Sequence, residues 1–519
     1  MRYTSLLLLS LMLTVGCSRP DDTTTSNTEP GDAQDMKAVE GDLGTPVEDM
    51  RAESGADMPA EDMTPAVTED MRGPEPDMKP EVCAWPTPII GGTPETDALV
   101  NAPARCGQPE HTWLTSGPFG QVKEYGKSYT INKALLRAFI ESEGLDFADR
   151  IKYDAQMEQF SYTTQDRGAL IDATAVVAYP KRADEILGTV LVLHGTTGFM
   201  DDCAPSGELE GSALAGLFAT LGYIAVAPDY IGLKALGEPS PEVHPYLIGQ
   251  ATAIASIDSL RALPQIMADK RGDFCPDTEY VVFGGSQGGH AALWVDRLAP
   301  YYARELDLLG SVATVPPADL IAQMERALIS VENSTGNTIA MLGTSAAWYE
   351  HTDKLNTAFN SPYDVDIPAA LAQDCSPKDA IPEDPTIEQV FSETLYGPAR
   401  MGMLEQVDPW GCIVAENGLT STSIPRINND SESYGILMLF GEDDDLVNTP
   451  IERDGFARLC AEQKMPMEFI ECAGAGHGPA SFYGMPEIMD FVAARFNREP
   501  FAAPCVVTPP TICRGTPPE

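Results

Sequence analysis

The feature that most constrains the fold is the alternation of short apolar runs with longer helical patterns between about residues 150 and 500. The apolar runs are YDAQMEQFSYTT (153–164), ALIDATAVVAYP (169–180), TVLVL (189–193), YIAVA (223–227), YVVF (280–283), SVATV (311–315), YGILMLF (434–440) and MEFIEC (467–472). The first two alternate like an exposed antiparallel pair, and the others are typical of buried parallel strands. Helical segments such as SALAGLFATLG, ATAIASIDSLRALPQIM and GFARLCAEQ lie between them. This order predicts an α/β fold with a doubly wound, mostly parallel sheet.

One interval interrupts this alternation, because 118 residues separate SVATV from YGILMLF. We expect an inserted subdomain here. Helical spacing relates Leu320, Ile321, Met324, Leu328 and Val331, and more loosely Ile339, Leu342, Ala346 and Tyr349. The insertion is therefore predicted to be at least partly helical, and its place in the chain suggests a lid over a substrate pocket. Most of these apolar residues are expected to form the insertion's own core.

The N-terminus carries an export signal. Arg2 precedes an apolar run from Leu6 to Val15, which is too short to span a bilayer permanently, and Gly16 and Cys17 follow. The segment resembles a bacterial lipoprotein signal, in which removal of residues 1–16 leaves a lipidated Cys17 as the new N-terminus. An ordinary cleaved signal with an incidental cysteine is the alternative. Ser18 suggests the outer membrane or cell surface as the destination.

An acidic segment follows the signal. Residues 18–82 hold 18 Asp and Glu against 5 Lys and Arg, few aromatic residues, and six irregularly spaced Asp-Met pairs. Such a segment buries too little apolar surface to fold, so residues 17–82 are predicted to form an extended, disordered tether. The whole chain has 78 acidic and 33 basic residues and a net charge of −45. This charge excludes nucleic acid and anionic membrane surfaces as favourable partners.

Ten cysteines remain besides Cys17, and in an exported protein we expect most of them to form disulfides. No CxxC pair or cluster of His and Cys indicates a metal site. Proximity in the sequence suggests five pairs, although connectivity does not follow from sequence alone: Cys83 with Cys106, Cys203 with Cys275, Cys375 with Cys412, Cys460 with Cys472, and Cys505 with Cys513.

The segment VVFGGSQGGH, from Val281 to His290, predicts a sharp turn between a strand and a helix. Ser286 lies at the centre of Gly284-x-Ser286-x-Gly288, after a β-branched and aromatic run and before the helix-forming AALWVDRL. In such an elbow the serine has a strained backbone, and the residues two before and two after it must be small. Ser286 is therefore the candidate nucleophile.

Seven motifs together resemble the secretory lipase group of α/β-hydrolases over roughly residues 150–495. They are HGTTG (194–198), GYIAVAPDYIGL (222–233), HPYLIGQATAIASIDSLRAL (244–263), GGSQGGHAALW (284–294), VPPADL (315–320), GEDDDLV (441–447) and AGHG (475–478). The resemblance implies hydrolysis of a small ester or lipid through an acyl-enzyme on Ser286, without metal or cofactor. The expected organisation is signal peptide 1–16, tether 17–82, hydrolase core 83–317 and 431–500, cap or lid 318–430, and C-terminal tail 501–519.

A serine nucleophile needs a base, and the base needs a carboxylate that fixes its tautomer. In α/β-hydrolases these residues follow the order Ser, acid, His, which selects His477 after the last strand. His111 and His244 precede the serine, His290 lies on the elbow helix, and His351 lies in the insertion. For the acid, hydrolases of this type commonly use the third residue after the strand-ending glycine, which selects Asp444. Asp443 and Asp445 remain alternatives.

The oxyanion of the reaction needs two backbone N–H donors. The residue after the nucleophile, Gln287, supplies one, and the HGTTG loop after the third strand supplies the other. Thr196 is the preferred donor in this loop, and Thr197 is the alternative.

Two other functions fit the same sequence. The triad would also serve a serine peptidase or amidase, which relative turnover of esters and amides would separate. A lipid-anchored binding protein without catalytic activity is the third hypothesis, since fold does not fix function. A silent relative usually lacks one member of the triad, whereas this chain has all three.

Overall fold

The computed structural model describes residues 85–517, except for 101, 103–104, 108–111, 184, 273 and 503. The predicted signal, Cys17 and the tether lie outside the described residues, as do Cys83 and His111. No helix in the described part of the chain combines the length and apolar character that crossing a bilayer requires.

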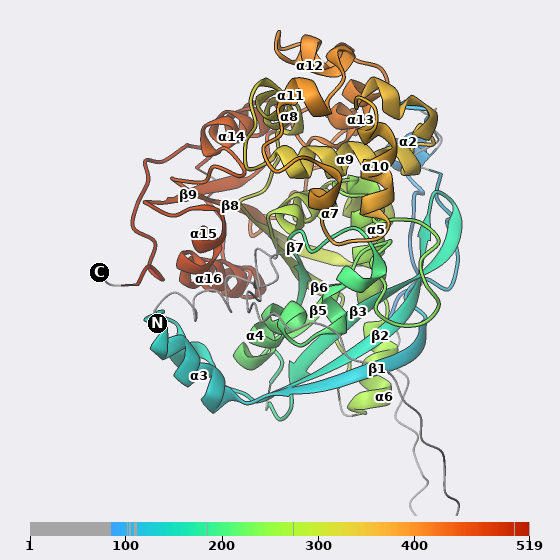
Figure 1. Ribbon diagram of the computed structural model, residues 1–519. Coiled ribbons are helices and arrows are strands. Elements are labelled where there is room, and N and C mark those ends of the chain that lie inside the picture. The colour runs from blue at the N-terminus through green and yellow to red at the C-terminus, as the bar shows by residue number, and fades with distance from the viewer. Residues whose placement is uncertain are drawn as a thin grey trace, which may run out of the picture. The chain divides into compact units, whose positions relative to one another are not determined.

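Nine strands of the described chain form one sheet in the order β1-β2-β3-β5-β4-β6-β7-β8-β9 (Figure 1). Their bounds are β1 Val122–Ile131, β2 Ala155–Asp166, β3 Ala169–Pro180, β4 Thr189–Leu193, β5 Ile224–Pro228, β6 Glu279–Gly285, β7 Asp307–Thr314, β8 Gly435–Gly441 and β9 Met467–Cys472. β4 to β9 pair in parallel, whereas β1, β2, β3 and β5 pair antiparallel in that order. The eight predicted strands and the mostly parallel sheet are confirmed, and β1 is an additional strand.

The predicted exposure of the first strand pair is wrong. β2 and β3 do pair antiparallel, from Ala155 opposite Pro180 to Asp166 opposite Ala169. However, β2 is buried over nearly its whole length, as is the second half of β3. The cause is that α4 and α5 pack against β2 from opposite faces of the sheet. β1 pairs with its outer edge. Polar side chains such as Thr164 and Gln165 are buried because they have hydrogen-bond partners there.

Helices cover both faces of the sheet. One apolar cluster joins the sheet to α5 Gly249–Leu260, α6 Leu263–Lys270, α7 Gln287–Tyr302 and α14 Thr449–Gln463. A second cluster joins the opposite face to α3 Lys133–Ser142, α4 Ala213–Leu221, α15 His477–Tyr483 and α16 Met485–Phe496. The remaining N-terminal helix is α2 Pro94–Val100, and short 3₁₀ turns are η1 Ala148–Arg150, η2 Asp201–Cys203, η3 Pro205–Gly207 and η4 Glu210–Ser212. The doubly wound arrangement is therefore confirmed.

The segment predicted as one helix over 251–267 is two helices, α5 and α6. Pro264 lies in the first turn of α6. A proline inside a continuous helix would lack an N–H donor and would clash with the carbonyl four residues earlier, which is that of Leu260. α5 ends at Leu260 for this reason.

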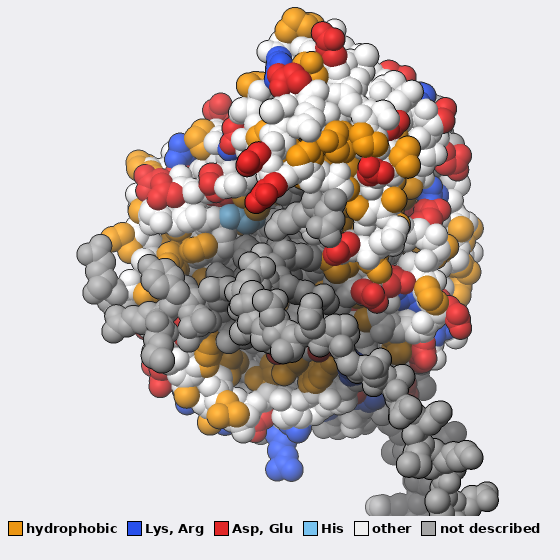
Figure 2. Space-filling view, viewed as in Figure 1, with side chains coloured by type: hydrophobic (Ala, Val, Ile, Leu, Met, Phe, Trp, Pro, Cys, Tyr) orange, Lys and Arg blue, Asp and Glu red, His pale blue; other side chains and the backbone are white. Residues whose placement is uncertain are grey.

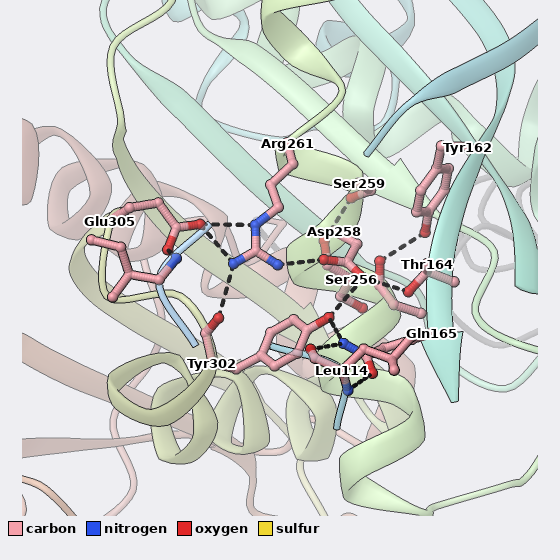
Figure 3. Close-up of polar contacts among 12 residues, drawn as sticks. Leu114, Tyr162, Thr164, Gln165, Ser256, Asp258, Ser259, Arg261, Tyr302 and Glu305 are labelled. Carbon is pink, nitrogen blue, oxygen red and sulfur yellow. Dashed lines mark hydrogen bonds and ion pairs between the residues drawn. The ribbon is translucent and has the colours of Figure 1, made fainter. Parts of the chain in front are cut away.

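A buried charged network fixes α5 and α7 to β2 (Figure 3). The Asp258 carboxylate accepts hydrogen bonds from the Arg261 guanidinium at 2.5 Å and from the Thr164 hydroxyl at 2.6 Å. Arg261 also donates to Glu305 at 2.6 Å. The side chains of Arg261, Asp258 and Glu305 are at most 4% exposed. Removing the Arg261 guanidinium would leave both carboxylates buried without a counter-charge.

Between β7 and β8 lie α8 Leu320–Ile329, α9 Thr335–Trp348, α10 Tyr363–Leu371, α11 Ile387–Val390, α12 Glu393–Ala399, α13 Trp410–Asn417, and the turns η5 Thr352–Thr357, η6 Pro377–Ala380 and η7 Leu404–Gln406. We call these elements the cap. They share an apolar cluster with residues outside the insertion, such as Phe199, Leu247 and Ile248, and they gather at the top of Figure 1. The predicted helicity of the insertion is confirmed, while its domain boundaries stay predictions.

Acidic side chains are spread over the face of the molecule that Figure 2 shows, and a few basic side chains are scattered among them.

The expectation that most cysteines form disulfides is confirmed, but the suggested pairs are wrong. The observed pairs are Cys106–Cys412, Cys203–Cys375, Cys460–Cys505 and Cys472–Cys513, and Cys275 is disulfide-bonded as well. The first two pairs span 306 and 172 residues, because the fold brings the cap against segments that precede the nucleophile elbow. The last two attach the C-terminal segment to α14 and β9.

Candidate active site

Ser286 lies at the turn between β6 and α7 in a strained conformation. Its φ is 57° and its ψ is −120°, a region that side-chain-bearing residues rarely adopt. A Cβ on Gly284 would lie 2.0 Å from the Gly288 carbonyl oxygen, and a Cβ on Gly288 would lie 2.0 Å from the Leu193 carbonyl oxygen. Both glycines are therefore required by the close approach of the backbone around the serine. The Ser286 N–H donates to Thr314 O at 2.8 Å, which ties the turn to the end of β7.

Three loops at the carboxyl ends of β6, β8 and β9 bring Ser286, Asp444 and His477 together. His477 Nε2 lies 2.9 Å from Ser286 Oγ, and His477 Nδ1 lies 2.7 Å from Asp444 Oδ2. The other carboxylate oxygen, Asp444 Oδ1, accepts hydrogen bonds from the N–H groups of Leu446 at 3.1 Å and Val447 at 3.0 Å. These two donors hold the carboxylate plane, so Oδ2 faces the imidazole and favours a proton on Nδ1. Nε2 is then free to accept the serine proton.

The neighbouring acids point elsewhere. Asp444 is 4% exposed, whereas Asp443 and Asp445 are exposed. Asp445 Oδ2 accepts a hydrogen bond from Asn333 Nδ2 at 2.6 Å, and Glu442 Oε2 accepts one from the Gly474 N–H at 3.0 Å. Of the four consecutive carboxylates, the structure places Asp444 against His477.

The other candidate bases bond to other groups. His290 Nε2 lies 2.7 Å from Asn417 O, and His351 Nε2 lies 2.6 Å from Cys106 O. Burial lowers the pKa of His290 to about 4 and that of His244 to about 3. Burial also lowers the pKa of His194, in the HGTTG loop, to about 4. The lowered pKa values of His194, His244 and His290 favour their neutral forms, so these three imidazoles are structural groups.

The two predicted oxyanion donors are free. In the described part of the chain, neither the Thr196 N–H nor the Gln287 N–H donates to another group. Gln287 begins α7, where the first-turn N–H groups have no partner within the helix. Its side chain is held by His244: Gln287 Nε2 donates to His244 Nε2 at 2.6 Å, and His244 Nδ1 donates to Ile231 O at 2.8 Å. The alternative donor residue Thr197 has a buried hydroxyl with no partner among the described residues.

Tyr246 is a site residue that the sequence did not reveal. It precedes α5 and is 3% exposed. Its hydroxyl lies 2.8 Å from Thr196 Oγ1 and accepts a hydrogen bond from Asn337 Nδ2 of α9 at 2.8 Å. The Tyr246 N–H donates to Thr344 Oγ1, also of α9, at 3.2 Å. Tyr246 thus connects the predicted oxyanion loop to the cap. Nothing in its spacing distinguishes it from a core tyrosine.

A pocket with a cavity volume of about 50 Å³ has Ser286 in its wall. Its walls come from the cap and from the loops before α5 and after β7 and β8. The lining residues are Tyr246, Leu247, Ser286, Pro317, Leu320, Gln323, Met324, Ser334, Asn337, Thr338, Met341, Leu446 and Val447. None of the residues lining this pocket carries a charge. Within the described ranges, no group of three or more His, Cys, Asp or Glu side chains is placed to hold a metal ion.

This arrangement agrees with the comparison of the sequence with protein families. The secretory lipase family matches residues 206–503, which is more than half of the chain. The chain belongs to the secretory lipase family. The match includes the elbow, the acid loop and His477, and it begins after the HGTTG loop.

Individual family relatives are distant. Lipase 2 of Candida albicans is 24% identical over 327 residues, which cover 57% of this chain and 62% of that protein. The secreted triacylglycerol lipase LIP4 of Malassezia globosa is 26% identical over 323 residues, covering 58% and 63%. The chain therefore spans less than two thirds of the length of these relatives.

Solved structures show that the fold is an α/β-hydrolase fold. The rice cell wall degrading esterase LipA from Xanthomonas oryzae superposes with a TM-score of 0.58 at 16% identity, over 73% of this chain and 98% of that one. Candida antarctica lipase A in its closed state gives a TM-score of 0.54 at 17% identity, over 82% and 90%.

Proposed function

We propose that this secretory lipase family member is a serine hydrolase of carboxylic esters. The observation that carries the proposal is the continuous chain of contacts from Ser286 through His477 to Asp444, at 2.9 and 2.7 Å. These are hydrogen-bond distances for a nucleophile, its base and an orienting acid. Family membership supports esters over amides as the substrate class.

In the proposed reaction, Ser286 Oγ attacks the ester carbonyl carbon while His477 Nε2 accepts the serine proton. The N–H groups of Gln287 and Thr196 donate to the negative oxygen of the tetrahedral intermediate. His477 then gives its proton to the departing alcohol, which leaves an acyl group on Ser286. A water molecule, deprotonated by His477, hydrolyses this acyl-enzyme by the same steps. Asp444 stays ionised throughout and stabilises the imidazolium.

The pocket supports small esters as substrates. One side of it is apolar, with Leu320, Met324, Leu446 and Val447 among its lining residues. Its cavity volume of only about 50 Å³ favours a short acyl group over a long one. We expect acetyl and butyryl esters to be hydrolysed with higher kcat/KM than palmitoyl esters.

A series of p-nitrophenyl esters from acetate to palmitate, with and without an emulsion interface, tests the proposal. Wild-type protein should hydrolyse the short esters, and Ser286→Ala and His477→Ala should lose this activity while remaining folded by circular dichroism. Full activity in either variant would refute the assignment. Turnover of aminoacyl amides above that of the esters would favour the peptidase hypothesis instead.

We also propose that the protein is exported and held at the bacterial outer membrane or cell surface by a lipid on Cys17. Membership of a secretory family supports export. The lipid anchor rests on the sequence of residues 1–18 alone. Metabolic labelling with a fatty acid tests it: label should enter the wild-type chain and be lost in Cys17→Ser. Equal labelling of the two would contradict the anchor.

A further inference from the structure

One side of helix α9 faces the pocket with polar groups. Ser334, Asn337, Thr338 and Met341 line the pocket together with Ser286. Ser334 is the N-cap of α9, and the spacing of three, one and three residues places all four on the same side of the helix. We call Ser334, Asn337 and Thr338 the polar face. Leu320 and Met324 of α8 also line the pocket, so its wall is divided between polar and apolar side chains.

Two hydroxyl groups of the polar face have no partner. The Ser334 hydroxyl is buried and makes no hydrogen bond within the described residues. Thr338 is only 6% exposed, and its hydroxyl also makes none there. Elsewhere on α9, Thr344 donates to Ala340 O at 2.9 Å and Ser345 donates to Leu342 O at 3.3 Å. Ser334 and Thr338 both line the pocket, so their unused hydrogen-bonding capacity is available to a ligand bound there.

Asn337 offers a hydrogen-bond acceptor to the pocket and connects the polar face to Tyr246. Its Nδ2 donates to the Tyr246 hydroxyl, which leaves its amide oxygen available. Tyr246 in turn contacts Thr196 in the predicted oxyanion loop. The polar face is therefore attached, through one side chain, to the loop that is proposed to hold the reacting carbonyl. A group bound by Asn337 would lie near the scissile bond.

The chemistry of the polar face selects neutral hydroxyl groups. Ser334 and Thr338 can both donate and accept, and the Asn337 oxygen accepts. No Lys or Arg lines the described pocket, so a carboxylate or phosphate would lack a counter-charge. A plain alkyl chain against this face would leave its polar groups unsatisfied.

We propose that the polar face is a subsite for hydroxyl groups close to the ester bond, so that the substrates are hydroxyl-bearing esters. The hydroxyl groups come either from a polyhydroxylated alcohol, such as a glycerol or sugar, or from a hydroxy acid. This inference rests on the proposed esterase function of Ser286.

Three butyrate esters that differ only in hydroxyl groups test the inference on the full chain. They are propyl butyrate, glyceryl monobutyrate and propyl 3-hydroxybutyrate, and a pH-stat measures their hydrolysis. With one or two added hydrogen bonds, kcat/KM for one of the hydroxylated esters should exceed that for propyl butyrate by about tenfold. A preference for the glyceryl ester identifies the alcohol as the source of the hydroxyl groups. A preference for the hydroxybutyrate identifies the acyl group.

Variants of the polar face provide the matched comparison. Ser334→Ala and Thr338→Val each remove one hydroxyl and should lower the ratio of hydroxylated to plain ester kcat/KM by roughly three- to tenfold. Thr338→Ser keeps the hydroxyl and should retain the ratio. Ser345→Ala removes a hydroxyl of the same helix that does not line the pocket, and it should leave the ratio unchanged.

Two results would overturn the inference. One is a wild-type ratio of one or less for both hydroxylated esters. The other is an unchanged ratio in Ser334→Ala and Thr338→Val while Ser286→Ala is inactive. Hydrolysis of all three esters by Ser286→Ala is a different result, because it removes the proposed function itself.

Discussion

Replacing Asp444 with asparagine should inactivate the enzyme through the tautomer of His477. Asp444 Oδ1 accepts two backbone N–H groups, at 3.1 and 3.0 Å. In Asp444→Asn the amide oxygen must keep this position, because the amide NH₂ cannot accept those bonds. The NH₂ group then faces His477 Nδ1. Nδ1 can accept a hydrogen bond from this group only when Nδ1 carries no proton. The imidazole proton moves to Nε2, which can no longer accept the proton of Ser286.

The expected cost follows from this geometry. A base held in the wrong tautomer lowers kcat by about four orders of magnitude, or ~5.5 kcal/mol of transition-state stabilisation. The fold should be almost unaffected, because the two backbone hydrogen bonds persist. We expect the unfolding free energy to change by no more than about 1 kcal/mol.

Steady-state kinetics on p-nitrophenyl butyrate and urea unfolding measure the two quantities. Asp443→Asn and Asp445→Asn are matched controls, since these exposed acids do not contact His477, and both should keep wild-type kcat. The reasoning is refuted if Asp444→Asn keeps kcat within about tenfold of wild type, well short of the four orders that a wrong tautomer costs. It is equally refuted if one of the control variants shows the large loss.

Three further predictions concern the scaffold. Gly288→Ala places a methyl group 2.0 Å from the Leu193 carbonyl oxygen and should lose thermal stability and ester turnover, whereas Gly336→Ala meets nothing within 4 Å and should retain both. Arg261→Met leaves two buried carboxylates uncompensated and should lower the unfolding free energy in urea by about 3–5 kcal/mol; a loss below about 1 kcal/mol would show that the network does not act as a buried ion pair. Burial lowers the pKa of His244 in the folded protein from 6.5 to about 3. As pH falls below 6.5, His244 is protonated in the unfolded chain before it is protonated in the folded one, so the unfolding free energy decreases. Between about pH 6 and 4 the unfolding free energy of wild type should fall more steeply than that of His244→Gln, by about 1.4 kcal/mol per pH unit, and equal slopes would contradict the buried neutral imidazole.

The sequence predicted the strands that carry a hydrophobic signal and missed the one that does not. β4 to β9 are apolar runs because both of their faces are covered. β1 is an edge strand, with Lys123, Glu124 and Lys127 mostly outside the core, so neither alternation nor an apolar run marks it. The exposure of β2 was mispredicted for a different reason: α4 and α5 cover its two faces, and its own alternation does not reveal helices that come later in the chain.

The site was predictable where local chemistry specifies it and unpredictable where distant segments meet. The elbow glycines and the order of Ser286, Asp444 and His477 are readable along the chain. The disulfides depend on the tertiary fold, as the pairing of Cys203 with Cys375 of the cap shows. Tyr246 and Thr338 likewise gain their place in the pocket only when α9 packs over the loop before α5.

Covalent labelling of Ser286 tests the central claim most directly. A p-nitrophenyl alkylphosphonate reacts with an activated serine and leaves a stable adduct that mimics the tetrahedral intermediate. Peptide mass spectrometry should find one adduct per chain, on the peptide that contains Ser286, with loss of esterase activity in the same proportion. Labelling should be much slower in His477→Ala. An adduct on another residue, or undiminished labelling of Ser286→Ala, would contradict the assignment of the nucleophile.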